Sequence, residues 1–274
     1  MKLDRMLIIT PAYRHPNPLL RAGIAALLLC AIGLPAQAEP YQQCVSLVES
    51  DPDAAYDVAL DWEATDLTGG ALHCGGLALT ALGLFDAAAK RFHRAATEGQ
   101  KLGSSERVAL LRQSGEAWLL AGQGTEAVAV FTEALAFTPT DPSLFFARAR
   151  AHDFGGETIL AYADVNAALD IDTTHGELYL LRARLNRQLD QLDDAMRDIE
   201  AALASNINPI SVRLERGLIR YEHGDDAGAL EDWRFVEQAG TSPDGTVGAA
   251  SRAATRFIVA LEAPAQEQAA PTLP

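Results

Sequence analysis

Residues 115–139 have the sequence GEAWLLAGQGTEAVAVFTEALAFTP, and the spacing of small and apolar residues in this stretch decides the fold. Four alanines follow one another at a constant interval: Ala127, Ala161, Ala195 and Ala229. A bulky apolar residue stands four positions after each alanine: Phe131, Val165, Ile199 and Trp233. A small residue stands twelve positions before each: Gly115, Ala149, Ala183 and Gly217. A constant interval of this length predicts a repeated structural unit.

Each copy has the pattern of two amphipathic helices joined by a turn, because its apolar residues recur at three- and four-residue spacing. A turn-forming residue lies five positions before each alanine: Gly122, Gly156, Asp190 and Gly224. The pairs Asp51-Pro52, Asp141-Pro142 and Asn208-Pro209 predict helix starts, with an N-cap side chain followed by proline. An earlier copy containing Gly76, Ala88 and Phe92 precedes the others by a longer interval, which predicts an insertion within residues 98–105.

These residues resemble the tetratricopeptide repeat family over about residues 69–240. The second copy matches most fully, with Gly115, Ala127, Phe131 and Pro139 at the family's small, alanine, aromatic and proline positions. Other copies depart from the pattern, since only Pro139 occupies the terminal proline position. The resemblance implies an all-α fold, a right-handed α-solenoid of about five helix-turn-helix repeats with N- and C-terminal capping helices.

The chain divides into five predicted segments. Residues 1–38 have a basic start, an apolar stretch and the small-x-small sequence Ala36-Gln37-Ala38, the order typical of a signal peptide cleaved after Ala38. An uncleaved membrane anchor is the alternative, although the apolar stretch is short for a membrane span. We expect an N-terminal helical cap over 39–66, the repeat array over 67–240, a capping helix over 241–262 and a disordered tail over 263–274.

Charge and cysteine content limit the partners and the compartment. The formal charge is −15, and it becomes −18 without the leader, which carries four basic residues and one acid. An acidic chain repels phosphate backbones, so we expect no nucleic acid partner. Cys44 and Cys74 remain after cleavage, and an even pair in an exported chain predicts a disulfide rather than a metal site or free thiols. The predicted location is therefore periplasmic or secreted, without stable membrane insertion once the leader is removed.

The sequence contains no pattern that indicates catalysis, a metal or a cofactor. It lacks a glycine-rich phosphate loop, a histidine pair at metal-ligand spacing and a nucleophile elbow. The histidines outside the leader fall in different repeats without a common spacing. We therefore predict that the protein is not an enzyme, and we expect no catalytic, metal or cofactor-binding residues.

The opening helices of the last three repeats are rich in arginine and the closing helices are rich in acids, including Asp164, Asp198 and Asp232. The resemblance places opening helices on the inner surface and closing helices on the outer one, so it implies a basic groove inside an acidic shell. The residues that fall on groove-lining positions of the family are Arg112, Phe146, Arg150, Phe154, Arg184, Arg187 and Tyr221.

Two interpretations of the arginines remain open. They hold an acidic or C-terminal peptide through bidentate contacts to carboxylates, or they pair with acids of neighbouring helices and join the repeats. The regular recurrence of Arg148, Arg182 and Arg216 favours the second interpretation of the arginines. The aromatic residues are either exposed in the groove or buried.

Three functions follow from these observations. The first is a non-catalytic scaffold that binds a partner peptide or helix in its groove. The second is an accessory factor that bridges components of a cell-envelope assembly or division complex, as proteins similar to this one do. The third is an enzyme or its regulatory subunit, which the absence of motifs disfavours. The sequence does not name the partner, the process or the oligomeric state.

Overall fold

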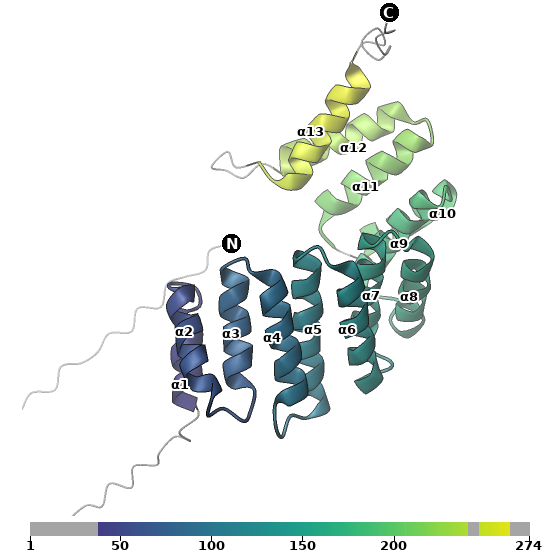
Figure 1. The fold of residues 1–274 in the computed structure, drawn as a ribbon. Helices are drawn as coiled ribbons and strands as arrows, with labels where there is room; N and C mark the ends of the chain where they lie inside the picture. Colours follow the sequence, from purple (N-terminus) through teal and green to yellow (C-terminus); the bar gives the residue numbers. More distant parts are fainter. Residues whose placement is uncertain (1–37, 206, 241–246, 264–274) are drawn as a thin grey trace, which may run out of the picture. The chain divides into compact units, whose positions relative to one another are not determined.

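A computed structural model describes residues 38–205, 207–240 and 247–263, which form thirteen α-helices and no β-strand (Figure 1). The first two are α1 (Ala38–Leu47) and α2 (Pro52–Glu63). Five pairs follow, which we call units 1 to 5: α3 (Gly70–Ala81) and α4 (Phe85–Glu98); α5 (Ser104–Leu120) and α6 (Gly124–Phe137); α7 (Pro142–Phe154) and α8 (Thr158–Ile171); α9 (Gly176–Gln188) and α10 (Leu192–Ala204); α11 (Pro209–Glu222) and α12 (Asp226–Ala239). The last helix is α13 (Ala249–Glu262). The predicted cleavage site and tail fall mostly outside the described residues.

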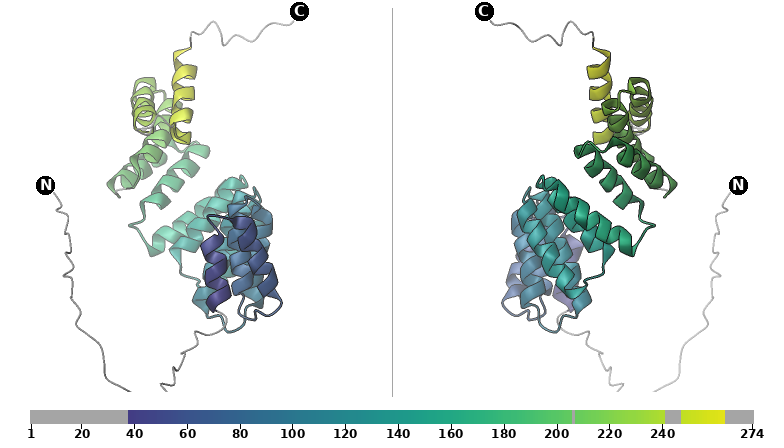
Figure 2. Two further views of the ribbon diagram at one scale, coloured as in Figure 1. Left: turned by 90° about the vertical axis from the view of Figure 1, so that its left-hand side faces the viewer. Right: turned by 90° about the vertical axis from the view of Figure 1, so that its right-hand side faces the viewer.

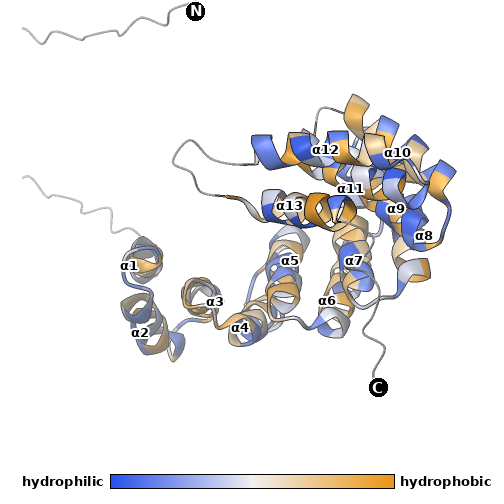
Figure 3. Ribbon diagram, turned by 90° about the horizontal axis from the view of Figure 1, so that it is seen from above, coloured by the Kyte–Doolittle hydropathy of each residue, from blue (hydrophilic) through white to orange (hydrophobic). Residues whose placement is uncertain are grey.

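Consecutive helices pack against one another along the whole series, which confirms the all-α repeat fold (Figures 1 and 2). Contacts that skip one helix join odd-numbered helices: α1 with α3, α5 with α7, α7 with α9, α9 with α11 and α11 with α13. Figure 3 shows α1, α3, α5 and α7 in one row and α2, α4 and α6 in another. We call the odd-numbered helix of each unit its opening helix and the even-numbered one its closing helix.

The helix boundaries form where the sequence predicts them. Asp51, Asp141 and Asn208 each accept a hydrogen bond from a backbone N–H of the helix that follows, and proline occupies the first helical turn. The turns between the paired helices use left-handed backbone at Gly83, Gly122, Gly156, Asp190 and Gly224, with φ between 60 and 84°. Glycine adopts this conformation without the Cβ clash that other residues meet.

A small residue in the opening helix lets a bulky residue of the closing helix approach it. A Cβ added to Gly115 of α5 would lie 2.4 Å from the Phe131 ring of α6, so only glycine fits there. The same relation holds for Gly76 with Phe92 and for Gly217 with Trp233. Phe131 also belongs to a core that includes Leu144 and Ala147 of the next unit. The bulky residue therefore packs both within its unit and towards the next one.

The insertion between units 1 and 2 consists of a loop and a longer helix. Helix α5 begins at Ser104 and has 17 residues, the longest among the described helices. In the loop, the backbone N–H of Gln100 donates to the carbonyl of Leu67, which ties the insertion to the segment before α3. The extra residues are thus absorbed without changing how the helices of unit 2 pair.

The N-terminal helices are fastened to unit 1 by a disulfide and an aromatic contact. Cys44 of α1 and Cys74 of α3 form the disulfide, and both are fully buried. Trp62 of α2 packs against Gly70, where an added Cβ would lie 2.6 Å from its ring. This arrangement is the one expected for a cap on the first repeat. Among the described helices, none has the length and apolar character needed to cross a membrane.

Candidate functional site

Three arginine–aspartate pairs join the opening and closing helices of units 3 to 5. Arg148 of α7 donates two hydrogen bonds to Asp164 of α8, at 2.8 Å from Nε and 2.6 Å from Nη2. Its remaining Nη1 donates to Thr132 of α6, so Arg148 fills the gap between two successive closing helices. The equivalent pairs, again 16 residues apart, are Arg182 with Asp198 and Arg216 with Asp232. We call these three pairs the arginine locks.

In the locks of units 4 and 5, a second donor from the same opening helix contacts the aspartate. Asn186 donates to Asp198 at 2.9 Å, and Arg220 donates to Asp232 at 2.9 Å. His152, at the equivalent position, lies 3.8 Å from Asp164 and 2.6 Å from Glu157. The hydrogen bonds to the aspartates raise the pKa of the three lock arginines above the ordinary value of an arginine side chain.

The prediction that the acids of the closing helices form an exposed outer shell is wrong for the three lock aspartates. Asp164, Asp198 and Asp232 are buried rather than exposed on the closing helices. A carboxylate tolerates burial when a bidentate arginine and a second donor satisfy its oxygens. Arg148, Arg182 and Arg216 therefore join helices, as the second interpretation of the arginines holds.

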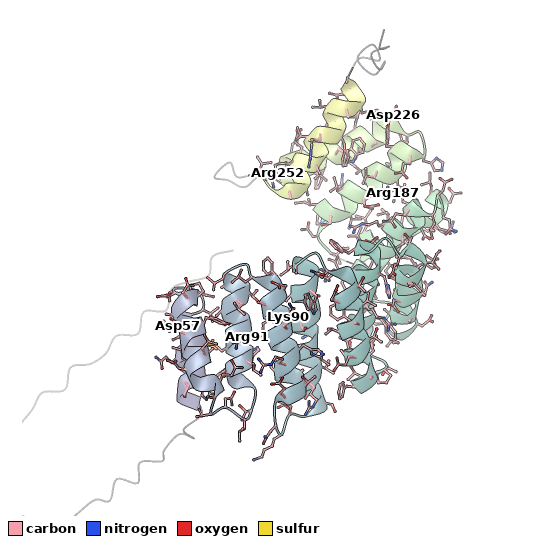
Figure 4. All side chains as sticks on the ribbon, in the orientation of Figure 1. Asp57, Lys90, Arg91, Arg187, Asp226 and Arg252 are labelled. Atoms are coloured by element: carbon pink, nitrogen blue, oxygen red, sulfur yellow. A yellow bond between two sulfur atoms is a disulfide. The ribbon has the colours of Figure 1, made fainter. Side chains whose placement is uncertain are left out.

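Three of the four arginines predicted to line the groove also have acidic partners, and these lie on neighbouring opening helices. Arg150 is 2.9 Å from Glu116 of the preceding unit. Arg184 is 3.5 Å from Asp153 and 3.7 Å from Glu215, and Arg187 is 2.6 Å from Glu215 and 2.7 Å from Glu222 (Arg187 is marked in Figure 4). The opening helices thus present arginines paired with acids of the neighbouring opening helices, and not the continuous basic surface that was predicted.

Arg112 is the exception. It is exposed on α5, and within the described part of the chain it makes no ion pair or hydrogen bond. Glu116, one turn further along α5, is instead paired with Arg150. Arg112 is therefore the predicted groove arginine with a guanidinium available to a ligand.

The three predicted groove aromatics differ in exposure. Phe154 is 58% exposed and Tyr221 is 48% exposed. Phe146 is half-buried, with its ring 5.6 Å from that of His175 and 5.9 Å from the guanidinium of Arg150. The structure thus leaves Phe154 and Tyr221 open to contact and uses Phe146 largely for packing.

Three adjoining hollows run along α1, α3, α5, α7 and α9, and we call them together the opening-helix groove. The first, of about 390 Å³, lies between Tyr41, His73 and Gln113. The second, of about 370 Å³, also touches Gln113 and is largely apolar, with Leu77, Phe92, Ala117 and Leu120 beside Arg112. The third, of about 290 Å³, shares Glu116 and Leu120 with the second and extends to Arg150, Phe154 and Arg184. Sequence reasoning missed this apolar floor because Leu77, Phe92 and Leu120 come from three different helices.

The first hollow ends at a half-buried pair of side chains. The Tyr41 hydroxyl lies 2.9 Å from Nδ1 of His73, and the two rings stack with centroids 5.9 Å apart. Burial lowers the pKa of His73, and a hydrogen bond with Gln113 opposes part of this effect. Burial also raises the pKa of Tyr41. The neighbouring Cys74 is bonded to α1, so the disulfide fixes Tyr41 over His73.

His93 and His223 form isolated pairs with Glu133 and Asp193, and His175 packs against Phe146. Among the described residues, no group of three or more His, Cys, Asp or Glu side chains is arranged to hold a metal ion. What the geometry offers is a long groove with apolar floors and one unpaired cation.

These features define the class of this protein, an α-helical repeat protein in which successive helix pairs stack and share one core after another. Residues 75–142 match the sequence model of the tetratricopeptide repeat family. The matched residues run from α3 to the start of α7, and the helix pairs of units 1 to 5 share the fold of solved tetratricopeptide repeat structures. A search of curated protein sequences finds no match to the chain.

Solved structures of tetratricopeptide repeat proteins share the fold. TTC0263 of Thermus thermophilus is 20% identical, with a TM-score of 0.53 over 70% of this chain and 98% of that chain. MamA of Desulfovibrio magneticus RS-1 is 17% identical, with a TM-score of 0.52 over 61% of this chain and 92% of that chain. YrrB, described as having an unusual peptide-binding site, is 13% identical, with a TM-score of 0.51 over 63% of this chain and 88% of that chain. At these identities the similarity concerns the fold alone.

Proposed function

We propose that this protein is a non-catalytic scaffold that binds a segment of another protein in the opening-helix groove. Solenoids of helix pairs present extended surfaces of this kind to their partners. The observation that carries the proposal is the second hollow, where the unpaired Arg112 stands beside an apolar floor. This combination suits a segment that presents an apolar side chain next to a carboxylate, either an acidic residue or a C-terminus.

The ion pairs of the groove refine this proposal. Arg150, Arg184 and Arg187 already contact acids, so a ligand carboxylate has to displace one of those acids to reach them. Arg112 requires no such exchange. We therefore assign the principal carboxylate contact to Arg112, and we assign Leu120 and Phe154 to apolar contacts further along the groove.

A displayed library of random peptides with free C-termini tests the proposal. Peptides selected by the purified protein should contain an apolar residue beside a carboxylate. Arg112→Glu should weaken their binding at least about tenfold, because a charged hydrogen bond is lost and a repulsion is introduced.

Arg197→Glu is the matched control, since it makes the same charge reversal on the closing helix α10, where Arg197 is exposed. This variant should bind the selected peptides as the unchanged protein does. Selected peptides that bind the Arg112→Glu variant equally well would show that the groove is not the binding surface.

We also propose that the protein works outside the cytoplasm. The leader sequence and the Cys44–Cys74 disulfide support this, because disulfides persist in oxidising compartments. In denatured extracts of expressing cells, a maleimide reagent should label neither cysteine before reduction. After reduction it should label two cysteines if the leader is removed and three if Cys30 is retained. A version without residues 1–38 should be labelled at both cysteines before reduction. Labelling of Cys44 or Cys74 before reduction in the protein expressed with its leader would contradict export.

A further inference from the structure

Unit 2 lacks the arginine lock of units 3 to 5, which in units 3 and 4 also reaches the preceding closing helix, from Arg148 to Thr132 and from Arg182 to Asn166. The lock arginine is replaced by Ser114, whose hydroxyl donates to the carbonyl of Ala89 at 2.8 Å. Val130 occupies the position of the buried aspartate, and Trp118 the position of the second donor. No arginine of α5 therefore joins α4 to α6 as Arg148 joins α6 to α8; among the described residues, the His93–Glu133 pair connects α4 with α6, and Trp118 lies between them.

A hollow of about 470 Å³ lies in that gap, and its floor is apolar. Trp118, Ala129 and Val130 line it, and Lys90, His93 and Arg94 of α4 form one edge. Trp118 is the half-buried member of the three tryptophans, since Trp62 and Trp233 are 9% and 2% exposed. We call this hollow the outer hollow. It shares no lining residue with the opening-helix groove.

The edge of the outer hollow carries charges of both signs, with Glu126 of α6 on one side and the basic residues of α4 on the other, and Lys90 is the basic group able to contact an anion beside the apolar floor. Lys90 lies 5.7 Å from the centre of the Trp118 ring (Lys90 is marked in Figure 4). Its acidic neighbour is Asp86, one turn earlier on the same helix at 3.5 Å, and both side chains are more than half exposed. An exposed pair of this kind contributes little, so Lys90 is free to contact a second carboxylate. His93 is paired with Glu133, and Arg94 is paired with Glu63 and Glu98.

We propose that the outer hollow is a second docking site, which accepts an aromatic or long aliphatic side chain carried next to a carboxylate by a partner protein. The apolar side chain packs on Trp118 and Val130, where the other units place their own arginine. The carboxylate contacts Lys90. The site is independent of the opening-helix groove, so the protein has two surfaces on which to hold other proteins.

Binding of 3-phenylpropionate, which joins an aromatic ring to a carboxylate, tests the site. In ¹H–¹⁵N correlation spectra of the full chain, the indole N–H signal of Trp118 should shift saturably, with a Kd of about 1–10 mM for a ligand of this size. The signals of Trp62 and Trp233 should stay in place. The uncharged 3-phenylpropanamide should bind several-fold more weakly, because it forms no ion pair with Lys90.

Restoring the missing lock should close the site. The double variant Ser114→Arg with Val130→Asp reproduces the residue pair of units 3 to 5, and it should abolish the shift of Trp118. Ala129→Trp fills the hollow from its exposed edge and serves the same purpose if the double variant does not fold. Arg112→Glu, which alters the opening-helix groove, should leave the titration unchanged.

Four results would overturn the proposal. These are the absence of a saturable Trp118 shift, equal binding of the acid and the amide, binding that survives the filling of the hollow, and binding that is lost with Arg112→Glu. Octanoate serves as a further comparison, since a lipid-like acid that binds more than tenfold more tightly than 3-phenylpropionate would identify a lipid rather than a protein as the occupant.

Discussion

Three lock aspartates, Asp164, Asp198 and Asp232, place negative charge in the interior of this protein. Asp198, for example, accepts two hydrogen bonds from Arg182 and one from Asn186. A buried ion pair adds little to stability compared with apolar residues of similar size. Losing one partner is a different matter, because the remaining charge is left in a poorly solvated place.

Asp198→Ala should therefore lower the free energy of unfolding by about 3 kcal/mol. The exposed Asp170→Ala, on α8, should change it by less than about 0.5 kcal/mol. Urea denaturation followed by circular dichroism measures both. The double variant Arg182→Met with Asp198→Leu should recover most of the loss, since it removes both charges together. Equal losses in the single and double variants would show that the charge left behind is not the cause.

Helices α1 and α3 meet through groups that differ from those joining the later helices. The disulfide and the Tyr41–His73 pair hold α1 to α3. In unit 1 the arginine is on the closing helix instead: Arg91 of α4 reaches over Gly75 of α3 and lies 3.0 Å from Glu63 of α2. An arginine–carboxylate pair thus joins the cap to unit 1, and in units 3 to 5 such a pair joins the two helices of each unit.

The contact between α1 and α3 should weaken in acid. Burial lowers the pKa of His73 below its ordinary value of 6.5, so the folded protein favours the neutral ring. Above pH 6.5 the ring is neutral in both states and protonation has no effect on stability. As the pH falls through 6.5, the unfolded chain binds the proton first and stability declines. The decline ends below the folded pKa, where both states are protonated.

The variant His73→Gln should accordingly lose less stability than the unchanged protein between about pH 8 and pH 5. Urea midpoints at the two pH values measure the loss, and effects of the carboxylates common to both proteins cancel in the difference. An equal loss in both proteins would mean that His73 is not held in its neutral form.

At the scale of the molecule, the distribution of the arginine locks divides the array. Units 3 to 5 have charged locks between their opening and closing helices, whereas unit 2 has the outer hollow. The unpaired Arg112 and the most apolar part of the opening-helix groove also lie on units 1 and 2. The opening-helix groove therefore lies beside an arginine without an acidic partner, and the outer hollow lies where unit 2 has no arginine lock. Because Arg112→Glu and the restored lock alter different sites, each should affect the binding of its own probe alone.

Much of the fold follows from local signals in the sequence. Four of the five units follow from the constant interval between the repeat alanines, and the first follows from an earlier copy at a longer interval. The caps at Asp141 and Asn208 mark helix starts. The left-handed turn at Asp190 was also predictable from its position in the repeat. The arginine locks could have been anticipated, since every lock arginine is followed by its aspartate at the same separation along the chain. Their burial could not, because exposure depends on how two helices face a third.

Local signals predict the all-α class, the repeat and its turns, because these features depend on residues close together in the chain or on a regular interval. The even number of cysteines outside the leader predicts the pairing of Cys44 with Cys74. The packing of the helices decides which arginines remain free, since Arg112 and Arg150 have the same chemistry and differ in whether an acid from another helix reaches them. It also decides where hollows form. Each hollow is bounded by side chains from several helices, and the residue spacing within one helix does not predict how that helix packs against the others.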